Sequence, residues 1–197
     1  MTSLKKDLTL AKRAAEFSKI LTETVVTSGT AETCELEAGM SAVCDKLGRL
    51  KAANQKLYIV GNGGSAGVAS HACIDFLNVA KISAFTLHEA SSLTCLANDY
   101  GYENAYALYV KQVAQAGDLL IAISSSGNSA NIHRACEAMK EKGGEVVTLS
   151  GFEVDNGLRQ QGNLNIWVPS SDYGIVEIAH QFILHNLSDR FGAGFEE

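Results

Sequence analysis

Five short apolar runs, separated by segments long enough to form helices, constrain the fold of this chain more than any other feature. They occupy residues 57–61, 83–87, 119–124, 145–149 and 164–169. Each has about the usual length of a β-strand. Their nearly continuous apolar character is typical of strands buried on both faces, as in a parallel sheet whose strands are joined by crossover helices. The pattern predicts a three-layer, doubly wound α/β fold around a five-stranded parallel sheet.

The residues ahead of the first run have a helical pattern. Apolar side chains recur at helical spacing at Leu4, Leu8, Ala11, Ala15 and Ile20. A break is expected at 27–29, and a second helix from about residue 33 to 50. We therefore predict an N-terminal pair of helices over 1–55, followed by one compact unit over 56–197. Two such helices either cover a sheet or build a subunit interface, and the pattern does not choose between these roles.

Composition excludes several classes of protein. Apolar residues make up 46% of the chain and charged residues 19%, with a single proline, which is ordinary for a globular domain. The net charge of −6 and the lack of a basic stretch give no support to nucleic-acid binding. No apolar stretch is long enough for a membrane span, and the N-terminus lacks the apolar centre of a secretory signal. Five cysteines without a CxxC pair predict buried thiols in a reducing cytoplasm.

Two loops rich in glycine and serine follow the first and third runs. They are GNGGSAG at 61–67 and SSSGNSAN at 124–131, and the second supplies four hydroxyls within the six residues from Ser124 to Ser129. Glycine lets a backbone approach an anion closely, and hydroxyls and free amides at a helix start hold phosphate. Either loop alone is better interpreted as a tight turn or a helix cap. Two of them at strand ends of one sheet favour phosphate binding. A nicotinamide site is disfavoured because the first loop has no GxGxxG pattern in register.

Acidic and histidine side chains recur at helical spacing in two segments. His71 and Asp75 are four residues apart, so they lie on one face of the helix expected after the first loop. Glu177, His180 and His185 lie on the last expected helix, where Glu177 and His185 are eight residues apart and also share a face. A histidine and a carboxylate from each helix would bind zinc or supply an acid and a base. Taken alone, His71 and Asp75 are better explained by a plain surface hydrogen bond than by a metal site.

The remaining histidines have no carboxylate at an informative spacing. We expect His88 and His133 to be structural or exposed. Asn98 and Asp99 have the local pattern of a loop or a helix end, which by itself indicates little.

Taken in order, these segments resemble the sugar isomerase (SIS) domain and, within it, the phosphoheptose isomerases. The resemblance rests on GNGGS, a helix with H-x-x-x-acid, LANDYG, GDLLIAISSSGNSAN and a last helix with acid-x-x-H-x-x-x-x-H, and it covers nearly the whole chain. Those enzymes convert sedoheptulose 7-phosphate to D-glycero-D-manno-heptose 7-phosphate. The resemblance therefore implies an aldose–ketose isomerase that works through an enediol.

The resemblance also implies roles for individual residues. Substrate contacts are implied for Asn62, Gly63, Gly64, Asp75, Asn98, Asp99, Ser124, Ser125, Ser126, Ser129 and Glu177. Zinc ligands are implied at His71, Asp75, Glu177 and His185. Asp75 would be the base and His185 the partner acid. Family members are homotetramers with sites shared between subunits, so the N-terminal helices are expected at an oligomer interface.

Four departures from the family pattern leave alternatives open. Asp75 stands where the family has glutamate, Glu177 where it has glutamine and Val68 where it has aspartate. The stretch FLNVAKIS lacks an expected arginine-containing loop. The alternatives are an isomerase of another phosphosugar and a non-catalytic SIS protein that senses a sugar or binds a protein partner. Two histidines and two acids remain in place, which favours an enzyme.

Overall fold

The computed structural model describes residues 8–29 and 32–193, and a seven-stranded sheet forms its centre. Five of the strands are parallel, in the order β4-β3-β5-β6-β7. Their bounds are β3 Leu57–Val60, β4 Ala84–Thr86, β5 Leu119–Ser124, β6 Glu145–Ser150 and β7 Leu164–Trp167. All five expected strands are thus confirmed within one or two residues at each end.

The strand count expected from the sequence is wrong by two. β1 (Val25–Ser28) pairs antiparallel with β7, and β2 (Thr33–Cys34) pairs antiparallel with β1, so the sheet is mixed. The expected break at 27–29 is partly strand. Val25, Val26 and Thr27 are β-branched and suit a strand, but four residues between two helices give no periodicity to detect. β1 covers the edge that β7 would otherwise leave unpaired.

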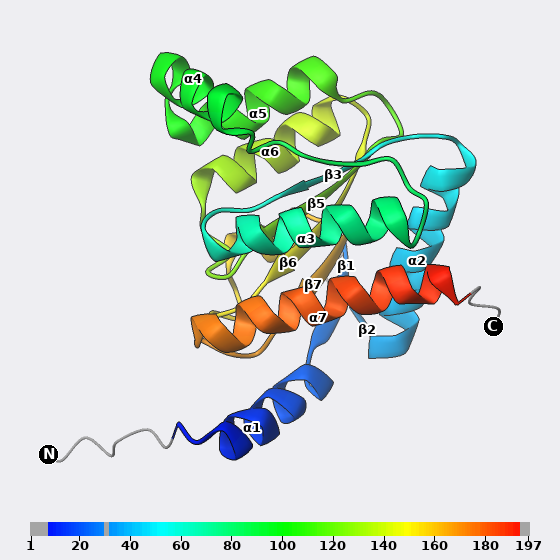
Figure 1. The fold of residues 1–197 in the computed structure, drawn as a ribbon, viewed down its shortest axis with the longest axis vertical. Coiled ribbons are helices and arrows are strands. Elements are labelled where there is room, and N and C mark those ends of the chain that lie inside the picture. Colours follow the sequence, from blue (N-terminus) through cyan, green and yellow to red (C-terminus); the bar gives the residue numbers. More distant parts are fainter. Residues whose placement is uncertain (1–7, 30–31, 194–197) are drawn as a thin grey trace, which may run out of the picture.

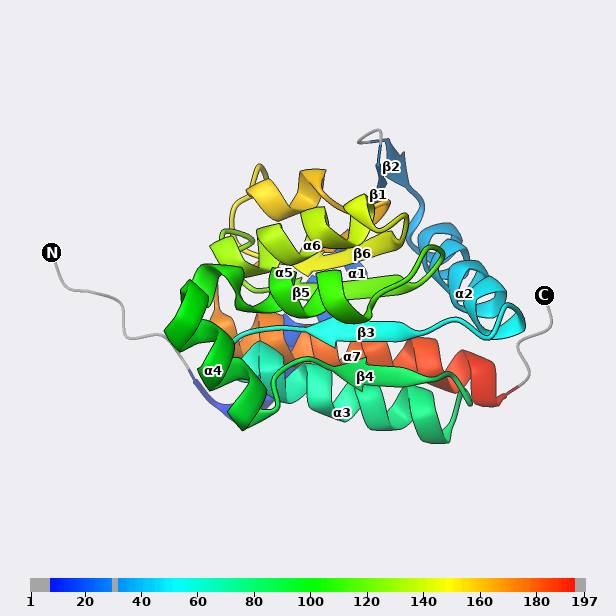
Figure 2. The same cartoon turned by 90° about the horizontal axis from the view of Figure 1, so that it is seen from above.

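Helices cover both faces of the sheet, which confirms the three layers (Figures 1 and 2). The helices are α1 Leu10–Thr22, α2 Leu36–Ala52, α3 Gly64–Asn78, α4 Ala90–Tyr100, α5 Tyr102–Val113, α6 Ala130–Glu141 and α7 Tyr173–Gly192, with a short 3₁₀ helix, η1, at Gly157–Gln160. Alternate residues of β5 explain the layers. Leu119, Ile121 and Ile123 pack in the core under α2, α3 and α7, whereas Leu120 and Ala122 pack under α5 and α6.

The N-terminal segment divides into two parts that pack differently. Helix α2 belongs to the main core through Val43, Leu47 and Leu50, which are buried. Helix α1 projects from the body in Figure 1, and none of its residues is buried. It contacts α7 through an edge-on ring pair, Phe17 and Phe182, with centroids 6.2 Å apart. The expected helix Thr33–Leu50 starts three residues later, and Leu4 lies outside the described residues.

The chain reverses its direction of travel across the sheet between β3 and β5. It moves from β3 outward to β4 and then returns to place β5 on the other side of β3. Helix α3, which follows β3, therefore covers one face, and α6, which follows β5, covers the other. In open α/β sheets the crevice at such a switch point is where ligands bind. The two glycine- and serine-rich loops flank this crevice.

The cysteines and the helix lengths bear on two further expectations. All five cysteines are free thiols, and Cys73 and Cys136 are buried as expected, whereas Cys95 on α4 is exposed. Within residues 8–29 and 32–193, no helix has both the length and the apolar character needed to cross a bilayer.

Candidate functional site

A pocket of about 300 Å³ opens at the switch point, and we call it the serine pocket. Eight of the residues expected to contact a substrate line it: Asn62, Gly63, Gly64, Ser124, Ser125, Ser126, Ser129 and Glu177. Ser65, Ile123 and Tyr173 complete the lining and were not expected from the sequence. The pocket thus unites two loops separated by about sixty residues of chain with the first turn of α7.

The first loop needs glycine for two different reasons. Gly63 has φ +54°, a left-handed conformation that side chains disfavour. At Gly64, a Cβ atom would lie 2.4 Å from the carboxylate carbon and from both carboxylate oxygens of Glu177, so only glycine leaves room for that side chain. Helix α3 begins here, and the first amides of a helix have no partner within it. The loop therefore offers backbone N–H groups and a helix N-terminus to an anion.

The second loop presents hydroxyls at the start of α6. Ser124 Oγ and Ser129 Oγ lie 3.1 Å apart, and Ser126 Oγ accepts a hydrogen bond from the Asn128 amide at 3.3 Å. The hydroxyl of Ser125 is buried and has no hydrogen-bond partner among the described residues. A buried hydroxyl without a partner costs free energy unless a ligand satisfies it. The serine pocket is therefore built to receive a group with several acceptor oxygens, such as a phosphate.

An amide pair joins the two loops. Asn62 Nδ2 donates to Asn131 Oδ1 at 2.9 Å, and Asn131 Nδ2 donates back to Asn62 Oδ1 at 2.8 Å. The Tyr102 hydroxyl donates to the same Asn62 oxygen at 2.7 Å. Asn131 is the last residue of the SSSGNSAN motif, so the motif marked it, but only the fold shows that it fixes the first loop. The pair holds the two glycine- and serine-rich loops in one relative position.

A second site lies on the outer surface of α3 and α7, and we call it the histidine cluster: His71, Asp75 and His185. One ligand atom from each lies within 4.8 Å of the other two. His185 Nδ1 approaches Asp75 Oδ2 to 2.9 Å, and His71 Nε2 approaches it to 3.7 Å. The imidazole rings of His71 and His185 stand edge to face, with centroids 4.7 Å apart. Tertiary packing thus brings together three of the four expected metal ligands.

The geometry of the histidine cluster fits a metal ion. Asp75 Oδ2 is buried, and although His185 Nδ1 is near, the angles there do not make a hydrogen bond within the described residues. Two imidazole nitrogens and a carboxylate oxygen are a ligand set typical of zinc. The side chains of His71 and His185 are 56% and 40% exposed, so the cluster is accessible.

The other expected site residues lie apart from the histidine cluster. Glu177 precedes His185 by eight residues of one helix, about 12 Å along its axis. Its carboxylate packs against Gly64 in the serine pocket, so the same chain does not bring it to the cluster. Asn98 and Asp99 lie in the last turn of α4, exposed and bonded to each other, and do not line the serine pocket.

His180 lies between these two sites and has a structural role. It is fully buried, and its Nε2–H donates to the carbonyl of Ser150 at 3.1 Å. Burial lowers its pKa to about 4, although the bond to Ser150 opposes the shift. The imidazole is therefore neutral at physiological pH, when it ties α7 to the end of β6.

The chain matches a known protein family over most of its length. The SIS domain family matches residues 17–151, which is more than half of the chain and includes both loops of the serine pocket.

The chain belongs to the SIS domain family.

Its relatives within the family share one name. It is 34% identical over 160 residues to the phosphoheptose isomerase of Colwellia psychrerythraea, covering 77% of this chain and 79% of the relative. It is 35% identical over 160 residues to that of Citrifermentans bemidjiense, covering 78% and 81%. The solved phosphoheptose isomerase GmhA from Neisseria gonorrhoeae superposes with a TM-score of 0.80 at 26% identity, covering 93% of this chain and 97% of that one. The SIS fold expected from the sequence is thus shown.

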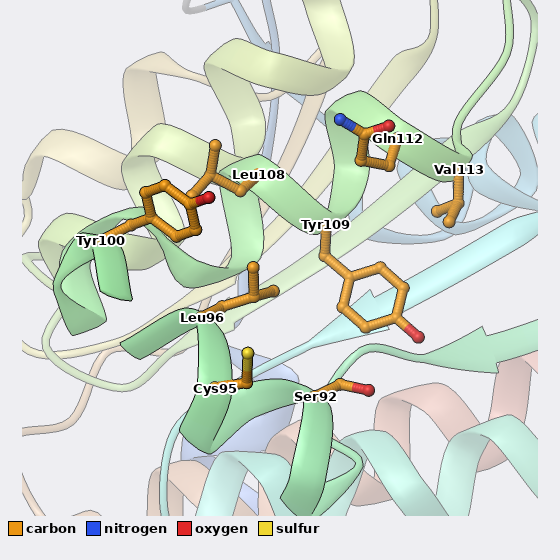
Figure 3. Close-up of a pocket in the computed structure, with 8 residues that line it drawn as sticks. All are labelled: Ser92, Cys95, Leu96, Tyr100, Leu108, Tyr109, Gln112 and Val113. Atoms are coloured by element: carbon orange, nitrogen blue, oxygen red, sulfur yellow. The ribbon is translucent and has the colours of Figure 1, made fainter. Parts of the chain in front are cut away.

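This SIS domain has a second hollow, of about 380 Å³, between α4 and α5 (Figure 3). Its lining is mostly apolar and consists of Ser92, Cys95, Leu96, Tyr100, Leu108, Tyr109, Gln112 and Val113. Neither loop of the serine pocket reaches this hollow, so it does not share the pocket's glycine and serine lining.

Proposed function

We propose that this SIS protein is an aldose–ketose isomerase of a phosphorylated sugar, converting sedoheptulose 7-phosphate to D-glycero-D-manno-heptose 7-phosphate through an enediol. The observation that carries the proposal is the serine pocket, whose buried Ser125 hydroxyl lacks a partner among the described residues, in a chain whose relatives are named phosphoheptose isomerases. The histidine cluster supports an enzyme rather than a sensor, because a sensor has no need of an acid and a base.

The serine pocket binds the phosphate of the sugar in this proposal. Ser124, Ser125, Ser126 and Ser129 supply hydroxyls, and the starts of α3 and α6 add backbone amides and the positive ends of two helix dipoles. These groups are neutral, so they hold the phosphate by directed hydrogen bonds. The pocket thereby fixes one end of the sugar and leaves its reacting end to other residues. Asn98 and Asp99 do not line this pocket, and we propose that they contact the substrate outside it.

Asp75 and His185 carry the proton transfers in this proposal. Asp75 takes the proton from C1 of the open-chain ketose, the C1–C2 double bond of the enediol forms, and the C2 carbonyl oxygen receives a proton from His185. The proton from the C1 hydroxyl then passes to His185, the C1 carbonyl forms, and C2 receives its proton from Asp75. The sum is an isomerisation with both residues restored. The 2.9 Å approach of Asp75 Oδ2 to His185 Nδ1 supports a pair that acts together.

We propose zinc as the cofactor, held by His71, Asp75 and His185. Bound zinc would polarise the oxygens at C1 and C2 of the sugar. Because Glu177 lies about two helical turns from His185 in its own chain, it would join a cluster only from a second copy.

A homotetramer in the cytoplasm completes the proposal. The exposed surface around the histidine cluster is apolar, with Ile74 61%, Ile178 59% and Phe182 51% exposed. Helix α1, which buries none of its own residues, lies beside this surface and contacts it at Phe182. Apolar patches of this kind are typical of association surfaces. Packing of copies over α1, α3 and α7 would bring the serine pocket of one copy toward the cluster of another.

The test is an isomerisation assay on the purified full chain with added zinc and sedoheptulose 7-phosphate, followed by detection of the aldose. We expect turnover that is lost on chelation, restored by zinc and abolished by Asp75→Asn. Zinc content by elemental analysis should fall in His71→Ala. Binding of the phosphosugar without turnover would contradict the isomerase and favour either another phosphosugar or a sensing role.

A further inference from the structure

The loop that lines the serine pocket is held from behind by groups outside it. The carbonyl oxygen of Gly127 accepts two hydrogen bonds, one from His133 Nε2 at 2.8 Å and one from the backbone N–H of Leu158 at 3.0 Å. His133 lies one turn along α6, and Leu158 lies in η1 after β6. Neither residue lines the pocket, so each would act on a ligand only through the loop.

The hydrogen bonds of His133 determine which ring nitrogen carries the proton. A carbonyl oxygen only accepts, so Nε2 must be the protonated nitrogen that donates to Gly127. The other nitrogen, Nδ1, then accepts from the amide Nε2 of Gln161 at 3.1 Å. Gly157 leaves space for the ring, because a Cβ there would lie 2.8 Å from His133 Cε1. The imidazole is therefore oriented on three sides.

The position of the Gly127 carbonyl controls the pocket side of the loop. Gly127 has φ +67°, and a Cβ there would lie 1.9 Å from Asn156 Oδ1, so both the backbone conformation and the available space favour glycine. A peptide group is planar and trans, so the N–H of Asn128 points opposite to the Gly127 carbonyl. That N–H donates to Ser126 Oγ, which lines the pocket.

We propose that His133 is a positioning residue for phosphate binding: through the Gly127 carbonyl, and itself oriented by Gln161, it sets the arrangement of the serine loop. This deepens the proposed function and rests on it, because it concerns how the same pocket holds the phosphate. Sequence spacing alone gave His133 no role.

The test compares His133→Ala with His133→Gln, whose amide nitrogen reaches about as far as Nε2 and restores the donor. The readouts are KM and kcat with sedoheptulose 7-phosphate, and the Kd of inorganic phosphate by calorimetry. In His133→Ala we expect KM and the phosphate Kd to rise about 10-fold, the effect of one lost hydrogen bond, while kcat changes less than about 3-fold. His133→Gln should recover most of the affinity. Gln161→Ala should raise the phosphate Kd about 3-fold, since it removes only the orienting bond.

Glu137→Ala is the matched control, because Glu137 is exposed one turn further along the same helix. Its KM and Kd should equal those of the wild type. A folded His133→Ala with wild-type phosphate Kd would overturn the inference, as would equal losses in His133→Ala and His133→Gln. Should His133→Ala fail to fold, an unchanged phosphate Kd in Gln161→Ala would overturn it. Failure of the wild-type chain to bind phosphate would instead remove the proposed function itself.

Discussion

The serine pocket is lined by two loops and the start of α7, whereas the histidine cluster lies on the outer surface of α3 and α7. In the pocket, Ser124 and Ser125 are nearly fully buried, and hydrogen bonds from Asn131 and His133 support the loops. At the cluster, His71 is more than half exposed and its surroundings are apolar and open. The pocket is preorganised by the fold, and the cluster is presented to whatever packs against α3 and α7.

In the proposed function, this difference separates phosphate binding in the pocket from chemistry at the cluster. Neutral hydroxyls and amides hold a phosphate well only when they are already oriented, because each badly aimed group loses most of its hydrogen bond. Acid–base and metal groups must instead reach a substrate that enters and leaves. If the two regions divide the work in this way, changes in one should leave the function of the other intact.

The largest effect is expected at the cluster. His185→Ala removes the proposed partner acid and a zinc ligand, so kcat should fall about 10²- to 10⁴-fold. The phosphate Kd by calorimetry should stay within about 2-fold of the wild type, because His185 does not line the pocket. A matching loss of phosphate binding would show that the two regions are not independent.

The next effect is on stability and comes from His180, which lies between the two regions on α7. Protonation of this side chain should shift the folding equilibrium by more than about 100-fold. Burial lowers its pKa from 6.5 to about 4. The native state therefore binds fewer protons than the unfolded state between these values. The stabilisation is present above about pH 6.5 and is lost as the pH falls toward 4, by up to about 3 kcal/mol.

The measurement is the free energy of unfolding in urea from pH 7 to pH 4. His180→Gln keeps an N–H donor for the Ser150 carbonyl and cannot titrate, so its curve should be flatter over this range. Equal slopes for the two proteins would contradict the prediction.

Disruption of the apolar surface around the histidine cluster should impair assembly but leave phosphate binding intact. Ile178→Glu places a charge on a side chain that is 59% exposed on α7. We expect a smaller particle by light scattering and about a 100-fold loss of turnover, the scale of a misplaced catalytic group. The phosphate Kd should be retained by the smaller particle. Val154→Glu, at an equally exposed apolar side chain outside this face, is the control; a full-size Ile178→Glu particle would remove the proposed interface.

A smaller effect is expected within the pocket. Ser125→Ala removes a buried hydroxyl that lacks a partner among the described residues. The phosphate Kd and KM should rise about 10-fold while kcat changes little, because one hydrogen bond to an anion is lost. Thermal unfolding should be unchanged or slightly higher, since a buried polar group without a partner is removed. Unaltered phosphate binding would contradict the assignment of the pocket.

The smallest effect has the opposite sign. Glu177 places a carboxylate against Gly64, in the pocket proposed for a phosphate. Glu177→Gln removes that charge at nearly constant size, so the phosphate Kd should fall about 3-fold as repulsion is relieved. The effect should shrink at high salt, which screens the repulsion. Weaker phosphate binding in Glu177→Gln would mean that the carboxylate supports the pocket rather than opposing the anion.

The two regions differ in how much of each could be predicted from the sequence. Both pocket loops were predictable, because glycine at a strand end and serine before a helix act through local backbone conformation. The pairs His71–Asp75 and Glu177–His185 were predictable as faces of helices. The contact between the two pairs was not predictable. The structure brings three of these residues together and leaves Glu177 in the pocket. The eight-residue spacing that puts Glu177 on the face of His185 also puts it two turns away.

What the sequence determined by itself are properties set within a few residues: five buried strands, the helices between them, and the two glycine- and serine-rich loops that follow strands. What only the tertiary structure decided are contacts between segments far apart in the chain. These include the order of the strands, the antiparallel β1 at the edge, the amide pair of Asn62 and Asn131, and the bond from His133 to Gly127. The physical reason is that hydrophobic period and backbone preference act locally, whereas these contacts depend on which surfaces pack together.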